Sequence, residues 1–189
     1  DVQVLGLCHS VQAPSRILAA RAGIPWRDLT FECAGINHLA WFTRLEHAGE
    51  DLYPRLMERA RRDLAGDPVD EWDAGDLVRK DMMLHFGAFI TESSGHLSEY
   101  LPYYRTDPEV MARYCGPEYD GESSFYARNW PQWRRNADAQ RDRMLAGEES
   151  VPAKRSWEYA SWIIEAREKH VPYVINANVP NRGGLIDNL

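Results

Sequence analysis

The sequence predicts an α+β fold, mostly helical with a few mixed strands. Five stretches place apolar residues at helical spacing, whereas extended runs are few and short. No internal repeat or low-complexity tract interrupts this pattern. With 189 residues, 44% of them hydrophobic, the chain is long enough for one sizeable domain.

The first third predicts a strand, a helix and a broken strand. Residues 2–7 form the strand candidate, and a turn at positions 8–10 leads to a helix over about 14–22, which Gly23 ends. Residues 29–41 alternate loosely. We expect two strand pieces broken at Gly35, with the break turning Asn37 and His38 out of the sheet.

The middle of the chain predicts two helices and a polar loop. Residues 51–64 are amphipathic and end at Gly66-Asp67-Pro68, and residues 76–86 form a second helix that ends near Gly87. Residues 89–104 are dense in polar and aromatic side chains. We interpret that stretch as a loop, too polar for the core and too aromatic for a plain linker.

The last third predicts two further helices and a closing strand. A long charged helix covers about 130–145, and a clear helical pattern covers 156–169, ahead of Pro172. Residues 173–179 close as a strand. The tryptophans Trp157 and Trp162 favour association into a homo-oligomer, and simple core packing is the alternative.

Charge and composition narrow the class of partner. The formal net charge of −7 disfavours nucleic acid, whose binding needs a basic surface. No apolar run is long enough to span a membrane and no signal segment opens the chain, so we expect a soluble, cytoplasmic protein. Three cysteines without CxxC spacing indicate reduced thiols. Carbohydrate, metal or small-molecule partners fit best.

Cys8 and His38 are the candidate metal ligands. Both follow short glycine-marked turns beside apolar runs, where a thiolate and an imidazole could converge on one ion. Such a pair suits Mn, Fe, Co or Zn, with further oxygen ligands from a substrate. The alternatives are a buried core cysteine and a histidine satisfied at a strand end.

Several other polar residues have two readings each. His9 and Ser10 either contact substrate or cap the following helix. Asp81 is either a general base or a solvated residue on its helix. Glu92, His96 and Glu99 have the spacing of one helix face. They bind substrate hydroxyls or orient metal ligands, and the alternative is a hydrogen-bonded loop.

Four blocks of sequence, taken together, resemble glycoside hydrolase family 4. They occur in the family's order and span nearly the whole chain: residues 6–12, 33–42, 86–100 and 178–189. Within that family, the run Cys8-His9-Ser10-Val11 resembles the α-galactosidase branch. The α-glucosidase and α-uronidase branches are the near rivals.

The resemblance implies an α-glycosidase, acting most readily on α-galactosides, that needs NAD⁺ and a divalent metal, usually Mn²⁺. In the family, NAD⁺ takes a hydride from C3 of the sugar, and a base then removes the acidified C2 proton. The glycosidic oxygen leaves from C1 by elimination, water adds, and the steps reverse. This redox route is an exception to glycosidase chemistry with two carboxylates.

The resemblance also assigns site residues. Cys8 and His38 match the metal ligands, and His9 matches a residue that lines the sugar site. Asn37 and Asn178 fall in blocks around the active site, so we predict that they bind substrate too. Asp81 falls near the position where some α-acting members keep an aspartate base.

The domain organisation departs from the family's pattern. No G-x-G-x-x-G follows a strand, as a nucleotide-binding domain requires. We therefore expect residues 1–189 to be a single domain, the middle, catalytic-metal part of such an enzyme, with the N-terminal Rossmann domain and the C-terminal end absent. Alone, it should bind NAD⁺ poorly. The alternative function is a non-catalytic carbohydrate-binding or dimerisation remnant.

Overall fold

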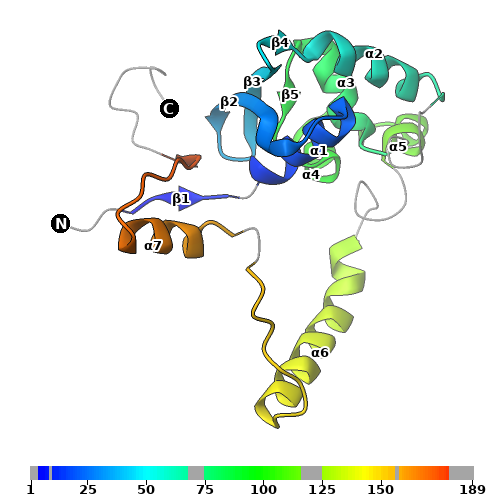
Figure 1. Ribbon diagram of the computed structural model, residues 1–189. Helices are drawn as coiled ribbons and strands as arrows, with labels where there is room; N and C mark the ends of the chain where they lie inside the picture. Colours follow the sequence, from blue (N-terminus) through cyan, green and yellow to red (C-terminus); the bar gives the residue numbers. More distant parts are fainter. Residues whose placement is uncertain (1–3, 9, 68–74, 116–124, 156–157, 179–189) are drawn as a thin grey trace.

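The computed structural model describes residues 4–8, 10–67, 75–115, 125–155 and 158–178 (Figure 1). The helices in these ranges are α1 (Gln12–Ala22), α2 (Tyr53–Leu64), α3 (Leu77–Phe86), α4 (Ser94–Tyr100), α5 (Pro108–Tyr114), α6 (Phe125–Leu145) and α7 (Ala160–Glu168). The strands are β1 (Gly6–Leu7), β2 (Leu29–Ile36), β3 (Leu39–His47), β4 (Glu50–Asp51), β5 (Phe89–Ile90) and β6 (Ala177–Asn178). The α+β prediction is confirmed.

The sheet is built on an antiparallel hairpin of β2 and β3. Their pairing runs from Leu29 opposite His47 to Ile36 opposite Leu39, and β4 and β5 also pair with β3. Helices α1 to α4 pack around this sheet and α5 lies at its far side, beyond α3, whereas α6 projects away from it and α7 lies beside β1 (Figure 1). The pair β1–β6 forms a separate two-stranded sheet.

The expected strand break at Gly35 is wrong. Strand β2 continues through Gly35 to Ile36, and the chain turns at Asn37 and His38 instead. The glycine serves a different need, because it has φ 138° and a Cβ there would lie 2.6 Å from the Cα of Ala40. Its missing side chain lets the two strands approach next to the turn.

The core lies between the sheet and helices α1 and α2, and a second cluster lies under α3 and α4. The main cluster includes the buried side chains Leu18, Ala22, Phe42, Leu45, Leu56 and Phe89. The second comprises Val78, Met82, Ile90, Leu97 and Tyr104. Strand β5 joins them, because its neighbours Phe89 and Ile90 face opposite sides.

Tyr53 fixes strand β5 against the hairpin. Its buried hydroxyl donates to the carbonyl of Phe42 on β3 and accepts the N–H of Phe89 at 3.0 Å. Burial raises the pKa of this phenol to about 12, so it remains protonated at physiological pH. The first residue of α2 thus sets the position where β5 enters the sheet.

A buried carboxylate, Asp76, ties three helices together. Asp76 Oδ2 accepts from the Arg21 guanidinium of α1 at 3.0 Å, and Oδ1 accepts from Arg79 Nε of α3 at 2.5 Å. The Ser94 hydroxyl of α4 donates to Oδ1 at 2.6 Å. Burial alone would raise the pKa of Asp76, but the two arginines outweigh it and lower that pKa to about 2.

A second buried ion pair joins α2 to α3. Lys80 Nζ lies 2.9 Å from Asp63 Oδ2, and it also donates to the carbonyl of Gly75 at 2.8 Å. Both side chains are almost completely buried. Burial lowers the pKa of Lys80, although the Asp63 carboxylate opposes this shift.

The stretch expected to be a polar loop is largely buried. Helix α4 occupies its centre, and the polar residues Thr91, Glu92, Ser94 and Ser98 are each at most 4% exposed. Hydrogen bonds satisfy buried groups there, such as the one that the Ser98 hydroxyl donates to the Gly95 carbonyl at 2.6 Å. Residues 89–98 therefore belong largely to the core of the fold, whereas Tyr100 and Tyr103 are exposed.

The other predicted helices and strands are found in the structure, some with different bounds. The helices expected over 14–22, 51–64 and 76–86 are confirmed to within two residues. Helix α6 begins at Phe125, before the expected 130, and α7 is shorter than the expected 156–169. The two terminal strands keep two paired residues each.

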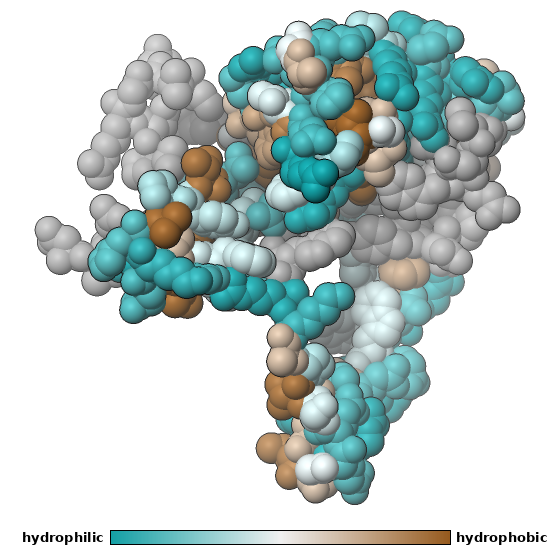
Figure 2. Space-filling model, in the orientation of Figure 1, coloured by the Kyte–Doolittle hydropathy of each residue, from teal (hydrophilic) through white to brown (hydrophobic). Residues whose placement is uncertain are grey.

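Exposed hydrophobic side chains gather outside the main body. They include Ile164 on α7, Val171 and Val174 after it, and Leu145 at the end of α6 (Figure 2). Trp162 is 40% exposed and lies under the Arg155 guanidinium, so simple core packing does not describe it. Trp157 lies outside the described residues. None of the described helices is both long and apolar enough to cross a membrane.

We expect Asp76→Asn to lower the free energy of unfolding by about 3–5 kcal/mol, because it leaves two arginines buried without their counter-charge. Urea denaturation of the chain at pH 7 measures this loss. The control is Asp67→Asn, whose side chain is 74% exposed beside Arg62. That change should alter stability by less than about 0.5 kcal/mol, and equal effects of both variants would refute the role of Asp76.

The same carboxylate predicts a pH dependence. Its pKa falls from 3.8 to about 2 on folding, so the unfolded chain binds more protons and stability rises with pH across this window. Asp76 therefore contributes roughly 2 kcal/mol above pH 4 that is lost as the pH falls towards 2. Urea midpoints of the parent and Asp76→Asn should converge over that range, and a constant difference would contradict this account.

Candidate metal centre

A pocket of about 220 Å³ lies where the hairpin meets the β1–β6 pair. Four separate stretches of the chain line it. They supply Gly6, Cys8, Ser10 and Val11; Cys33 to His38 with Ala40; Thr91; and Ile175 to Asn178. The predicted metal pair Cys8 and His38, and the predicted substrate residues Asn37 and Asn178, therefore all line one cavity.

The pairing of β1 with β6 brings the two ends of the chain to this pocket. Gly6 pairs with Asn178 and Leu7 with Ala177. A Cβ on Gly6 would lie 3.0 Å from the Asn178 amide nitrogen, so glycine leaves this side chain its space. Asn176 also lines the pocket. The alternation of Asn176 and Asn178 in an extended segment is a signal that could have predicted both.

The hairpin turn presents Asn37 and His38. His38 adopts a left-handed backbone conformation, with φ 65°. Histidine, asparagine and aspartate occupy this region more readily than most other residues with a side chain. A two-residue turn between long paired strands holds the His38 backbone at the mouth of the pocket.

Cys8 lies between the end of β1 and the start of α1. Its Sγ is 3.1 Å from the Ser10 hydroxyl. Helix α1 has Val11 at its N-cap without a side-chain capping bond, so Ser10 does not cap it. Cys33 is a second thiol in the pocket, but burial raises its pKa to about 11. Cys33 therefore stays protonated at neutral pH and is a poor metal ligand.

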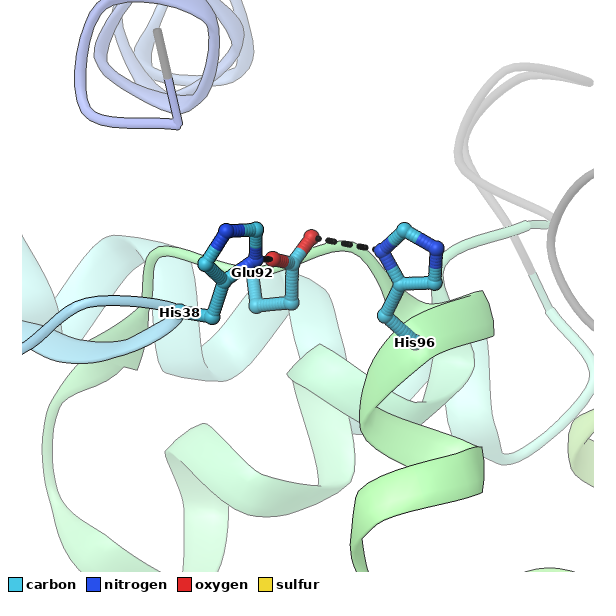
Figure 3. A group of neighbouring side chains, drawn as sticks. All are labelled: His38, Glu92 and His96. Atoms are coloured by element: carbon cyan, nitrogen blue, oxygen red, sulfur yellow. Dashed lines mark hydrogen bonds and ion pairs between the residues drawn. The ribbon is translucent and has the colours of Figure 1, made fainter. Parts of the chain in front are cut away.

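Glu92 lies between two histidines, His38 of the turn and His96 of α4 (Figure 3). Its Oε2 is hydrogen-bonded to Nδ1 of His38, and its Oε1 lies 3.3 Å from Nδ1 of His96. Oε1 also accepts the N–H of Ser93 at 2.7 Å. Burial raises the pKa of Glu92, but the bonds from Ser93 and His38 outweigh it, so the pKa is lowered and the side chain is ionised.

The register of β5 explains why Glu92 meets His38. Ile90 pairs with Trp41, and the N–H of Thr91 donates to the Ala40 carbonyl at 2.9 Å. The next residue, Glu92, therefore stands beside the turn. The helical spacing of Glu92 and His96 left open whether they serve the site or belong to a hydrogen-bonded loop. The contact of Glu92 with His38 depends on strand pairing that no local pattern reveals.

The two remaining predicted residues are Asp81 and His9. Asp81 is on α3, where its carboxylate accepts the hydroxyl of Tyr104 at 2.7 Å and that of Tyr114 at 3.4 Å. Burial and the bond to Asp81 raise the pKa of Tyr104. Asp81 is not among the described residues that line the cavity. His9 lies outside the described residues.

The donor atoms of the pocket fit a divalent metal ion. Cys8 offers a sulfur, His38 a nitrogen, and Asn37 and Asn178 offer amide oxygens. A soft and a borderline ligand beside oxygen donors suit a borderline transition-metal ion with open positions for further oxygens. The buried carboxylate hydrogen-bonded to the histidine is the usual support for an imidazole ligand.

Comparison with known sequences identifies the relatives. The family 4 glycosyl hydrolase C-terminal domain matches residues 33–189. The α-galactosidases of Bacillus subtilis and Rhizobium meliloti are each 34% identical over the whole chain, which covers 41% and 38% of their lengths. An α-galacturonidase of Lachnoclostridium phytofermentans is 24% identical over the whole chain, covering 43% of that protein. The chain thus spans about two fifths of its relatives.

Solved structures have the same fold. LplD from Bacillus subtilis, described as a glucosidase, superposes with a TM-score of 0.75 at 27% identity over 96% of this chain and 44% of that one. A 6-phospho-α-glucosidase from gut microorganisms, in complex with NAD and Mn²⁺, superposes with a TM-score of 0.52 at 19% identity. It covers 87% of this chain and 37% of that one, and supports the fold alone. The chain therefore belongs to glycoside hydrolase family 4.

Proposed function

We propose that this chain forms the metal-binding part of an α-glycosidase that uses NAD⁺ and Mn²⁺, with α-galactosides as substrates. One observation carries the proposal. Residues 170 positions apart in the sequence, Cys8 and Asn178, meet Asn37 and His38 around one cavity. The two α-galactosidases that are 34% identical over the whole chain support the choice of substrate.

In this proposal Cys8 and His38 hold the metal ion, and Asn37 and Asn178 hydrogen-bond the sugar hydroxyls from two walls of the pocket. A bound divalent ion supplies electrostatic stabilisation of negative charge on sugar oxygens. The cavity of about 220 Å³ is below the roughly 300–1,000 Å³ of pockets for drug-sized ligands. That size suits one sugar ring rather than a longer oligosaccharide.

The lining favours a neutral sugar over an acidic one. Among the described lining residues there is no arginine or lysine. A carboxylate at C6, as in a galacturonide, or a phosphate there would lose its hydration without meeting an arginine or lysine side chain among these residues. This difference supports an α-galactoside over the acidic substrates named for other relatives.

No lining residue of the pocket is assigned to NAD⁺ binding or to the general base. We assign no residue of this chain to NAD⁺, because the sequence has no glycine-rich phosphate loop after a strand. Asp81 is not among the described residues that line the pocket, and two tyrosine hydroxyls donate to its carboxylate. Its role as general base therefore stays a prediction. What the chain supplies is the metal ligands and the polar walls around them.

We expect Cys8→Ser and His38→Ala each to weaken Mn²⁺ binding by about 100-fold or more, since losing a direct ligand costs more than the 10–100-fold typical of its supporting groups. Electron paramagnetic resonance of free Mn²⁺ during titration of the reduced chain measures this. The control is Cys115→Ser, whose Sγ faces the Tyr104 carbonyl at 3.7 Å away from the pocket. Mn²⁺ affinity equal to that of the parent in Cys8→Ser and His38→Ala would contradict the proposed metal site.

We expect the enzyme that contains this chain to cleave 4-nitrophenyl α-D-galactoside at least about tenfold faster, in kcat/KM, than the matching α-D-galacturonide. The reason is the cost of an unpaired carboxylate in the pocket. Release of nitrophenolate should need both NAD⁺ and Mn²⁺ and should stop with a chelator. Preference for the galacturonide would reject the substrate proposal, and activity without either cofactor would reject the mechanism.

A further inference from the structure

We propose that Glu92 is a positioning residue that fixes the tautomer and orientation of His38, so that Nε2 carries the lone pair offered to the metal. This inference rests on the proposed metal site. It concerns a residue that touches neither the pocket nor, in our proposal, the ion itself, because Glu92 is not among the described lining residues.

The arrangement of the carboxylate carries the argument. Glu92 is 4% exposed, and each of its oxygens faces a ring nitrogen of a different histidine, both of them Nδ1 (Figure 3). An ionised carboxylate can only accept hydrogen bonds. In the neutral imidazole of His38, Nδ1 must therefore carry the proton, and Nε2 is left as an acceptor, directed away from Glu92 (Figure 3).

The turn alone does not fix the ring. The left-handed backbone of His38 sets where its Cβ begins, but χ2 of a histidine is a broad torsion that the backbone leaves free. The side chain of His38 is 38% exposed, so packing does not hold it either. The bond to Glu92 is the constraint that selects one ring orientation.

Glu92 is itself held on a rigid base. The N–H of Ser93 donates to its Oε1, and the next residue, Ser94, donates to the buried Asp76. On its other side, the ring of His96 lies between Tyr100 and Tyr126, with centroids 5.9 and 6.0 Å away. A rotation of the Glu92 carboxylate would break its hydrogen bonds to the Ser93 N–H and to His96. The carboxylate therefore has a fixed orientation and can fix the orientation of the His38 ring.

The three side chains also permit a rival reading, in which they bind a metal ion directly. Their ligand atoms lie within 4.8 Å of one another. In that case the ion would take Nδ1 of His38, and His96 would be a ligand. The positioning role makes the opposite demand, because Nδ1 of His38 then bears a proton and His96 is dispensable for the metal.

The test uses Glu92→Gln, with Glu99→Gln as the matched control on an exposed acid of α4 that does not contact His38. The readout is ¹⁵N NMR of histidine-labelled, metal-free chain at about pH 8.5, about two units above an ordinary imidazole pKa. His38, assigned by its loss in His38→Ala, should be protonated on Nδ1 in the parent and in Glu99→Gln. In Glu92→Gln the Nε2–H form should become populated.

Metal affinity gives the second readout. Mn²⁺ binding, followed by paramagnetic resonance, should weaken about 10–100-fold in Glu92→Gln and recover at least partly in Glu92→Asp, which keeps the charge. His96→Gln should stay within about threefold of the parent. Circular dichroism and urea midpoints verify folding, and Glu92→Asp supplies the comparison if the glutamine variant does not fold.

Three results would overturn the inference. They are an Nε2-protonated His38 in the parent, an unchanged tautomer in folded Glu92→Gln, and a loss of Mn²⁺ affinity in His96→Gln as large as in Glu92→Gln. The two proposals fail separately. A parent chain that binds no Mn²⁺ would reject the metal site, while the metal-free NMR spectrum still decides the role of Glu92.

Discussion

The buried carboxylate of Asp76 is the interaction on which the rest of this structure depends. It joins arginines of α1 and α3 to a serine of α4, and the side chains of Asp76 and both arginines are at most 9% exposed. A buried charge is tolerated only where its partners are fixed, so the three helices have one permitted arrangement. Because α4 begins at Ser94, two residues after Glu92, the contact between Ser94 and Asp76 also helps to fix the position of the Glu92 carboxylate beside the hairpin turn.

The two halves of the site differ in how many contacts support them. Strand pairing, the Tyr53 hydroxyl and the start of α4 support His38 and Glu92. The positions of Cys8 and Asn178, by contrast, depend on the pairing of β1 with β6, two strands of two residues each. In our proposal, the first half orients the imidazole of His38, and the second contributes the sulfur of Cys8 and the amide of Asn178.

The sequence was most informative where local patterns decide the structure. Helical periodicity predicted α1, α2 and α3, and glycine-marked turns pointed to Cys8 and His38, which line one pocket. Prediction from the sequence failed where contacts between residues far apart in the chain decide the structure. Gly35 suggested a break because a glycine's role in close strand packing depends on what lies opposite, and Glu92 looked loop-like because its partners are 54 and 4 residues away. The family resemblance supplied the chemistry that spacing alone left open.

The β1–β6 pair also bears on how the molecule folds. The hairpin joins neighbours in sequence, a pairing of the kind that forms within microseconds, whereas Gly6 meets Asn178 only after a loop of roughly 170 residues has closed. A two-residue ladder returns little free energy for that closure. An ion bound by both Cys8 and His38 would hold the segment after β1 against the hairpin turn, and so keep β1 in place for its late pairing with β6.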